Sequence, residues 1–125
     1  MFLSVVVPAL NEERYIGQCL VSLTAQSYPR ELYEIIVVDN ASTDWTPEIT
    51  LGFRVRVIYE AERGIGQARH RGAQAAKGEM IAGTDADAIA PPTWLEEIAR
   101  AFRSDELLGA VTGPILLHDG NRLEC

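Results

Sequence analysis

The sequence predicts an α/β protein with a doubly wound, mostly parallel sheet and helices on both faces of the sheet. Two short runs, residues 3–8 and 34–38, are continuous, apolar and rich in β-branched side chains, which is typical of strands covered on both faces. Segments with helical periodicity separate the strand-like runs, and this alternation favours right-handed crossovers between parallel strands. At 125 residues the chain has the length of one domain with its own core, and we treat residues 1–125 as that domain.

The strand at residues 3–8 ends at a proline, and signals for a helix follow it. Asn11 is a good N-cap residue, and Glu12 and Glu13 suit a first helical turn because the helix dipole favours negative charge there. Apolar residues then recur at helical spacing over residues 16–23. We therefore predict a first helix that starts at Asn11.

The second strand is expected at residues 34–38 and is followed by Asp39. The turn-rich segment 40–44 leads to Pro47, which is tolerated in a first helical turn, so a short helix is predicted there. Residues 54–59 alternate arginine with valine and predict a third strand near the edge of the sheet.

The remaining elements complete the alternation. Residues 64–77 predict a helix with Lys77 in its last turn, residues 79–84 a fourth strand, residues 91–102 a helix opened by two prolines, and residues 107–117 a further extended segment. One face of the helix at 64–77 carries small residues that allow close approach to the sheet: Ala68, Gly72, Ala75 and Ala76.

Three polar segments follow predicted strands: residues 8–12, 39–44 and 85–87. In an open parallel sheet, ligands bind outside the carboxyl ends of the strands. We therefore expect these three segments to converge on one crevice.

Two carboxylates, Asp85 and Asp87, stand two residues apart at the mouth of the fourth strand and are expected to project to one side of the chain. Like charges at this spacing repel unless a cation lies between them, and a hard divalent ion such as Mg²⁺ or Mn²⁺ prefers carboxylate and phosphate oxygens. The alternative is an acidic loop that is merely solvated.

Several other polar residues allow two interpretations each. Asp39 could accept hydrogen bonds from a base or a ribose, or it could simply form the turn after its strand. Asn11 and Glu12 are explained by a helix start as well as by a ligand. Gly64 and Gly66 lack the third glycine of a dinucleotide-binding motif, but a glycine-rich helix entry can bring amides near an anion, and Arg69 could pair there with a diphosphate.

The overall charge limits the partners. Eighteen acidic and eleven basic residues give a net charge of −7, which argues against a nucleic-acid or anionic-membrane surface. The first apolar run is too short for a membrane span and lacks the basic start of a signal peptide. Cys19 and Cys125 form no disulfide framework, so we expect a cytoplasmic protein.

Four segments, residues 4–13, 38–46, 64–72 and 84–87, together resemble the nucleotide-binding part of a family 2 glycosyltransferase of the GT-A fold. They occur in the family's order and span nearly the whole chain. His70 departs from this pattern, because the family usually has asparagine there. The resemblance implies transfer of a sugar from a UDP- or GDP-sugar to a saccharide or lipid-linked acceptor, at the inner face of a membrane in many relatives.

The resemblance also implies roles for individual residues. Asp87 and Asp85 would bind Mg²⁺ or Mn²⁺. The nucleotide-binding residues would be Pro8, Ala9, Asn11, Glu12, Asp39, Arg69, Asp85 and Ala86. Members of the family continue into an acceptor-binding region that supplies the general base, so we expect this chain to carry only the donor and metal site and nominate no base within it.

Two other classes of function stay open. A nucleotidyltransferase would also place Mg²⁺-binding carboxylates at strand ends, but it usually has a glycine-rich, basic loop after the first strand. Here that loop, residues 9–12, is acidic and has no glycine. A non-catalytic nucleotide-binding module is the other alternative.

Overall fold

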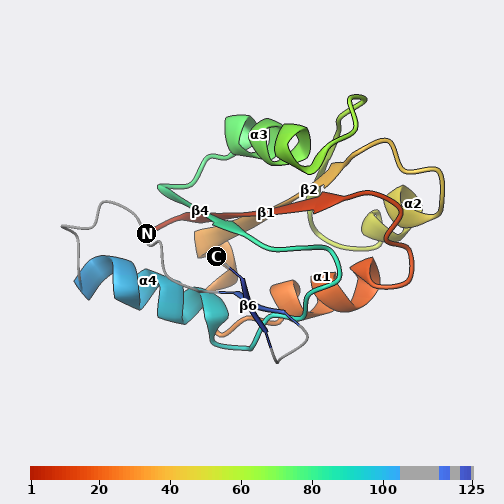
Figure 1. Cartoon of the computed structure of the whole chain (residues 1–125). Coiled ribbons are helices and arrows are strands. Elements are labelled where there is room, and N and C mark those ends of the chain that lie inside the picture. Colours follow the sequence, from red (N-terminus) through yellow and green to blue (C-terminus); the bar gives the residue numbers. More distant parts are fainter. Residues whose placement is uncertain (105–115, 119–121, 125) are drawn as a thin grey trace.

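The chain forms a four-stranded parallel sheet in a computed structural model that describes residues 1–104, 116–118 and 122–124 (Figure 1). The strands of this sheet are β1 (Leu3–Ala9), β2 (Tyr33–Asp39), β3 (Arg56–Tyr59) and β4 (Met80–Gly83). Their order across the sheet is β3-β2-β1-β4, and all neighbouring pairs are parallel. This confirms the predicted fold class and the outer position of β3.

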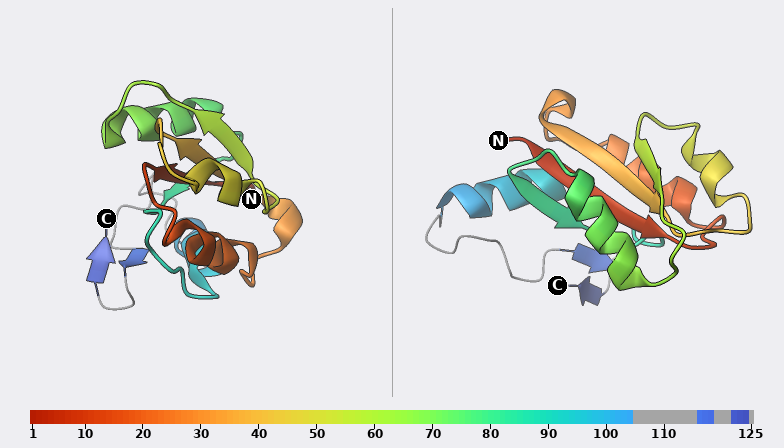
Figure 2. Two further views of the ribbon diagram at one scale, coloured as in Figure 1. Left: turned by 90° about the vertical axis from the view of Figure 1, so that its right-hand side faces the viewer. Right: turned by 90° about the horizontal axis from the view of Figure 1, so that it is seen from above.

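Helices cover both faces of the sheet. The described helices are α1 (Ile16–Thr24), α2 (Thr46–Thr50), α3 (Ile65–Ala75), α4 (Trp94–Ser104) and the 3-10 helix η1 (Arg30–Leu32). α3 lies on one face, whereas α1 and α4 lie on the other, with α2 packed beside α1 (Figures 1 and 2). None of the helices in the described ranges is both long and apolar enough to cross a membrane.

Side chains from the two faces of the sheet form two cores. The larger core joins alternate residues of β1 and β2, among them Val5 and Val37, to α1 and α4. The smaller core joins Val6, Ile36 and Val38 to α3. The continuous apolar runs of β1 and β2 therefore bury both faces, as the sequence predicts.

The first helix begins later than predicted. α1 starts at Ile16 after Tyr15 and has no acidic residue in its first turn, so the prediction of Asn11 as its N-cap residue was wrong. The amides of Tyr15 and Ile16 donate to the Glu12 carbonyl (3.0 and 2.8 Å), which makes a turn before the helix. Asn11 has a φ of 54°, a left-handed conformation that asparagine tolerates better than most residues.

The end of the chain is only partly described. α4 starts at Trp94, after the two prolines that were predicted to open it. The extended segment predicted at 107–117 lies outside the described residues except for its last two, which begin β5 (Leu116–His118). β5 pairs antiparallel with β6 (Arg122–Glu124) in a separate two-stranded sheet.

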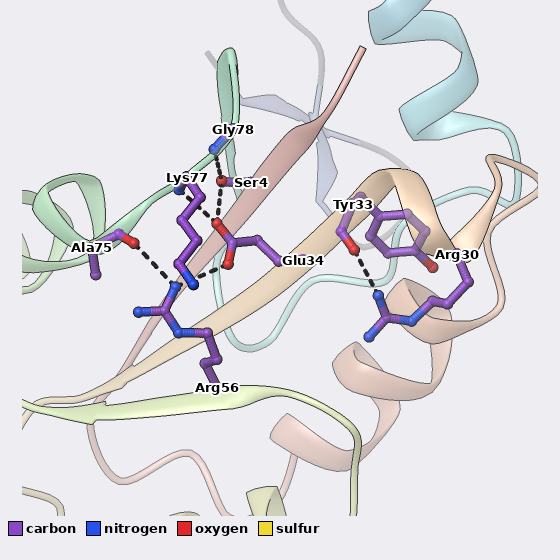
Figure 3. A network of polar contacts seen from close by, with 8 residues as sticks. All are labelled: Ser4, Arg30, Tyr33, Glu34, Arg56, Ala75, Lys77 and Gly78. Atoms are coloured by element: carbon purple, nitrogen blue, oxygen red, sulfur yellow. Dashed lines mark hydrogen bonds and ion pairs between the residues drawn. The ribbon is translucent and has the colours of Figure 1, made fainter.

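A polar network joins the amino edge of the sheet to the segment after α3 (Figure 3). Glu34 accepts hydrogen bonds from the Ser4 hydroxyl (2.6 Å), the Lys77 amide (2.7 Å) and the Arg56 guanidinium (2.9 Å). The Ser4 hydroxyl also accepts a hydrogen bond from the Gly78 amide (2.8 Å). α3 ends before Lys77, so Lys77 is not in its last turn as predicted, and this network fixes the entry into β4 instead.

We expect Glu34→Gln to lower the free energy of unfolding by about 1–2 kcal/mol at neutral pH, because a charged acceptor of three hydrogen bonds is lost. Burial raises the pKa of Glu34, but the hydrogen bonds from Ser4, Lys77 and Arg56 outweigh burial and hold this pKa below its usual value. The stabilisation is therefore complete above the unfolded-state pKa and is lost as pH falls through the folded-state pKa.

Urea unfolding of both proteins between pH 7 and pH 3 checks this expectation. The two unfolding free energies should converge as pH falls through the folded-state pKa of Glu34, because the wild-type carboxyl group then becomes protonated. A difference that stays constant over the whole range would show that the charge of Glu34 is not what stabilises the fold.

Candidate functional site

A cleft opens at the carboxyl end of β1, where later strands of the chain lie on opposite sides of β1. The last pair between β1 and β4 joins Val6 to Gly83, after which β1 continues beside β2 as far as Ala9. Because β2 and β4 flank β1 on opposite sides, the carboxyl ends of β1 and β4 form the switch point at which open α/β sheets bind ligands. The left view of Figure 2 faces this edge of the sheet.

The cleft has a volume of about 350 Å³. The residues that line it are Pro8, Ala9, Leu10, Glu12, Asn40, Gly64, Ile65, Asp85, Ala86 and Asp87. The cleft thus brings together most of the residues that were predicted to bind the nucleotide or the metal. These residues come from both sides of the switch point. Three predicted residues, Asn11, Asp39 and Arg69, are not among the lining residues. Asn11 and Asp39 contact the surrounding loops, and Arg69 pairs with the lining residue Asp85.

The acidic pair, Asp85 and Asp87, lies on a segment of alternating burial. Ala86, Ala88 and Ala90 are buried in the larger core, whereas Asp85 and Asp87 are half-buried. The segment has no regular secondary structure beyond a turn closed by the Ala88 amide and the Asp85 carbonyl (3.1 Å). The buried alanines therefore anchor the backbone and leave both carboxylates at the cleft.

The cleft concentrates negative charge. Glu12, at the opposite wall, has a raised pKa because of burial first and then because of repulsion from Asp87, Asp85 and Asp44. Repulsion of this kind shows that the carboxylates of both walls act on one another across the cleft. A cation placed between them would remove the repulsion.

The acidic pair fits a hard divalent cation that shares its coordination with a ligand. In the part of the chain that the structure describes, no group of three or more His, Cys, Asp or Glu side chains could hold a metal ion by itself. Mg²⁺ is commonly bound by one or two carboxylates together with phosphate oxygens and waters. Asp85 and Asp87 beside an open cleft offer this incomplete set of donors.

Arg69 lies at the rim of the cleft. Its guanidinium pairs with the Asp85 carboxylate at 3.5 Å, and its side chain is 59% exposed. An exposed pair at this distance contributes little to stability, so Arg69 can exchange Asp85 for another anion at small cost. The structure therefore places the predicted phosphate-binding arginine beside the acidic pair.

Asp39 forms the turn after β2. Its side chain is buried, and its carboxylate accepts a hydrogen bond from the Ser42 amide (3.1 Å). This contact matches the interpretation of Asp39 as a turn former. Contact with a base, the other interpretation, stays a prediction.

Asn11 joins two loops at the carboxyl edge rather than capping α1. Its side-chain oxygen accepts a hydrogen bond from the Thr43 amide (2.7 Å). Two residues along, the Glu13 carboxylate accepts one from the Trp45 amide (3.0 Å), and the Glu13 amide donates to Asp44 (3.2 Å). These bonds tie the loop after β1 to the loop after β2 and so hold Glu12, which lies between them in the sequence, at the cleft.

Asn40 lines the cleft, and the sequence analysis missed it. Its buried side chain donates to the carbonyls of Glu60 (3.0 Å) and Glu62 (2.9 Å) and accepts from the Gly64 amide (2.9 Å). It therefore holds the loop before α3 against the cleft. Its place directly after a strand was a visible signal, but its partners are all backbone groups, which a side-chain pattern does not reveal.

Comparison with known proteins agrees with this geometry. The family model described as glycosyl transferase family 2 matches residues 4–123. The glycosyltransferase AglE of Haloferax volcanii is 37% identical over 101 residues, which are 76% of this chain and 33% of AglE. The chain thus spans about a third of the length of this relative.

Two solved structures share the fold. The first is TarS of Staphylococcus aureus in complex with UDP-GlcNAc, with a TM-score of 0.80 and 31% identity over 85% of this chain and 32% of that one. The second is the mannosyltransferase PcManGT of Pyrobaculum calidifontis in complex with GDP-Man and Mn²⁺, with a TM-score of 0.76 and 33% identity over 80% and 32% of the two chains. Since the family model covers almost the whole sequence, the chain belongs to glycosyl transferase family 2.

Proposed function

We propose that this chain binds a nucleotide-diphosphate sugar together with Mg²⁺ or Mn²⁺, as the donor site of a glycosyltransferase that passes the sugar to an acceptor hydroxyl. The observation that carries the proposal is the acidic pair, which faces the end of β1 across the switch-point cleft. Two structurally similar proteins bind UDP-GlcNAc and GDP-Man, which supports a donor of this class.

Each wall of the cleft has its own part in this proposal. Asp85 and Asp87 would hold the divalent ion, and Arg69 would turn from Asp85 to the diphosphate. When bound, the ion would neutralise charge on the diphosphate and so improve it as a leaving group. The wall that follows β1, with Pro8, would take the nucleoside, and Asp39, next to the lining residue Asn40, would contact the base.

Three parts of the reaction are proposed on the resemblance to the family alone. We place the general base that activates the acceptor hydroxyl outside this chain, because an inverting transfer needs such a base and the chain spans about a third of its relatives. We also propose inversion at the sugar carbon and a saccharide or lipid-linked acceptor.

Calorimetric titration with UDP and GDP, each with and without Mn²⁺, tests the donor site on this chain. We expect one of the two nucleotides to bind at least about 100-fold more tightly with Mn²⁺, which corresponds to about 2.8 kcal/mol of added binding free energy. The proposal fails if the folded chain shows no metal-dependent binding of either nucleotide.

A further inference from the structure

Behind the acidic pair, one face of α1 and its extension carries three polar side chains, Cys19, Ser22 and Gln26, which we call the α1 polar stripe. Their spacing of three and four residues puts them on one face of a helix. Gln26 lies just after α1 but continues this face, because its side-chain amide donates to the Ser22 carbonyl (3.1 Å). The stripe faces residues 85–95, which comprise most of the connection between β4 and α4 and the start of α4.

The first two members of the stripe bind the backbone on both sides of Asp87. The Cys19 thiol donates a hydrogen bond to the Asp85 carbonyl (3.5 Å), and this carbonyl also accepts a hydrogen bond from the Ala88 amide. The Ser22 hydroxyl accepts a hydrogen bond from the Ala90 amide (3.0 Å). Asp87 therefore lies between two points at which α1 holds the chain.

Gln26 fixes the far end of the same segment with both ends of its amide. Its nitrogen donates to the Pro91 carbonyl (2.7 Å), and its oxygen accepts from the Leu95 amide (2.9 Å) in the first turn of α4. The amides at the start of a helix have no partner within the helix, so Gln26 satisfies one of them from outside. Removing its side chain would break the hydrogen bonds at both of these points.

We propose that Gln26, at the far end of the α1 polar stripe, is a positioning residue for the acidic pair. The segment 85–91 has no regular secondary structure of its own, so hydrogen bonds from α1 act together with its buried alanines to decide where its backbone lies. A divalent ion demands defined positions of its carboxylate ligands, and a loop that must first be ordered binds it more weakly. The inference rests on the proposed function, because it takes Asp85 and Asp87 as the metal ligands.

The test compares Gln26→Ala with Thr24→Ala. Thr24 is a matched control, because within the described part of the chain its hydroxyl bonds only to carbonyls of its own helix, at Leu20 (2.9 Å) and Val21 (3.2 Å). We expect Gln26→Ala to weaken nucleotide binding in the presence of Mn²⁺ about tenfold, because the connection that carries both carboxylates would then have to be ordered when the ion binds. Binding without Mn²⁺ should change less than about twofold, and Thr24→Ala should change neither affinity.

Equal losses with and without Mn²⁺, or no loss at all, would overturn the proposal. Gln26→Glu provides a second variant, because it keeps the acceptor for the Leu95 amide but sets a carboxylate oxygen against the Pro91 carbonyl. It should also bind nucleotide with Mn²⁺ more weakly than the wild type.

Hydrogen exchange of the metal-free chain separates this inference from the proposed function. We expect the amides of Asp87 and Ala90 to exchange faster in Gln26→Ala than in the wild type, while those of β1 stay unchanged. Unchanged exchange at residues 86–90 would overturn the positioning role, whatever the metal dependence. A wild-type chain without metal-dependent binding would instead refute the proposed function alone.

Discussion

Replacing Asp87 by alanine is expected to abolish the Mn²⁺-dependent part of nucleotide binding, with a loss of affinity of at least about 100-fold. Loss of an outer partner of a metal ligand commonly costs about 10–100-fold, so removal of a ligand itself should reach the upper end of this range or exceed it. The fold should persist, because the Asp87 side chain is half-buried and lies at the cleft rather than in the core. Calorimetry with UDP or GDP, with and without Mn²⁺, measures both affinities.

Glu31→Ala is the matched control for this variant. Glu31 is exposed on η1, which precedes β2 at the amino edge of the sheet, so its loss changes the net charge equally but far from the cleft. It should leave both affinities within about twofold of the wild type, since exposed charges beyond a Debye length are screened. In any longer form of the protein, sugar transfer undiminished by Asp87→Ala would assign the acidic pair a structural role.

Gly72→Ala is expected to destabilise the fold by about 2–3 kcal/mol, because α3 packs on the sheet through this position. A β-carbon at Gly72 would lie 2.4 Å from a methyl group of Val6 and 3.1 Å from one of Val38. Both valines are buried and β-branched, so their side chains cannot rotate away cheaply. Relief requires a shift of α3 away from β1 and β2, and overpacking of this kind typically costs about 1–3 kcal/mol.

Gly66→Ala, on the same helix, should do the opposite. A β-carbon there meets nothing within 4 Å, so the substitution should stabilise α3 by about 0.5–1 kcal/mol through helix propensity alone. Thermal or urea unfolding of both variants measures the contrast. Equal effects of the two substitutions would show that the close approach at Gly72 does not limit the packing of α3.

The strands and their edge could be predicted because their signals are local. A parallel sheet was predicted from the β-branched runs of β1 and β2 and from their alternation with helices. Parallel strands necessarily share a carboxyl edge. The small-residue face of α3 was likewise predicted from the sequence, and Ala68 and Gly72 are buried against the sheet.

The start of α1 could not be predicted because the competing interaction is not local. Asparagine is a preferred N-cap residue, which is why Asn11 was predicted to begin the helix. Its side-chain oxygen instead accepts a hydrogen bond from the Thr43 amide, 32 residues along the chain. The same holds for the supports of the cleft. The partners of Asn40 and Gln26 are backbone groups of distant segments, and such groups leave no trace in a pattern of side chains.

Paramagnetic broadening of the amide NMR signals by Mn²⁺ in the presence of UDP or GDP locates the metal most directly. The account predicts that the amides of Ala9, Glu12 and Asp87 broaden first, at Mn²⁺ levels that leave those of Ser4 and Lys77 sharp. Ser4 lies about 17 Å from Ala9 along β1, and broadening falls steeply with distance. Broadening that starts at the amino edge, or that spares Asp87, would contradict a metal-assisted nucleotide site at the switch point.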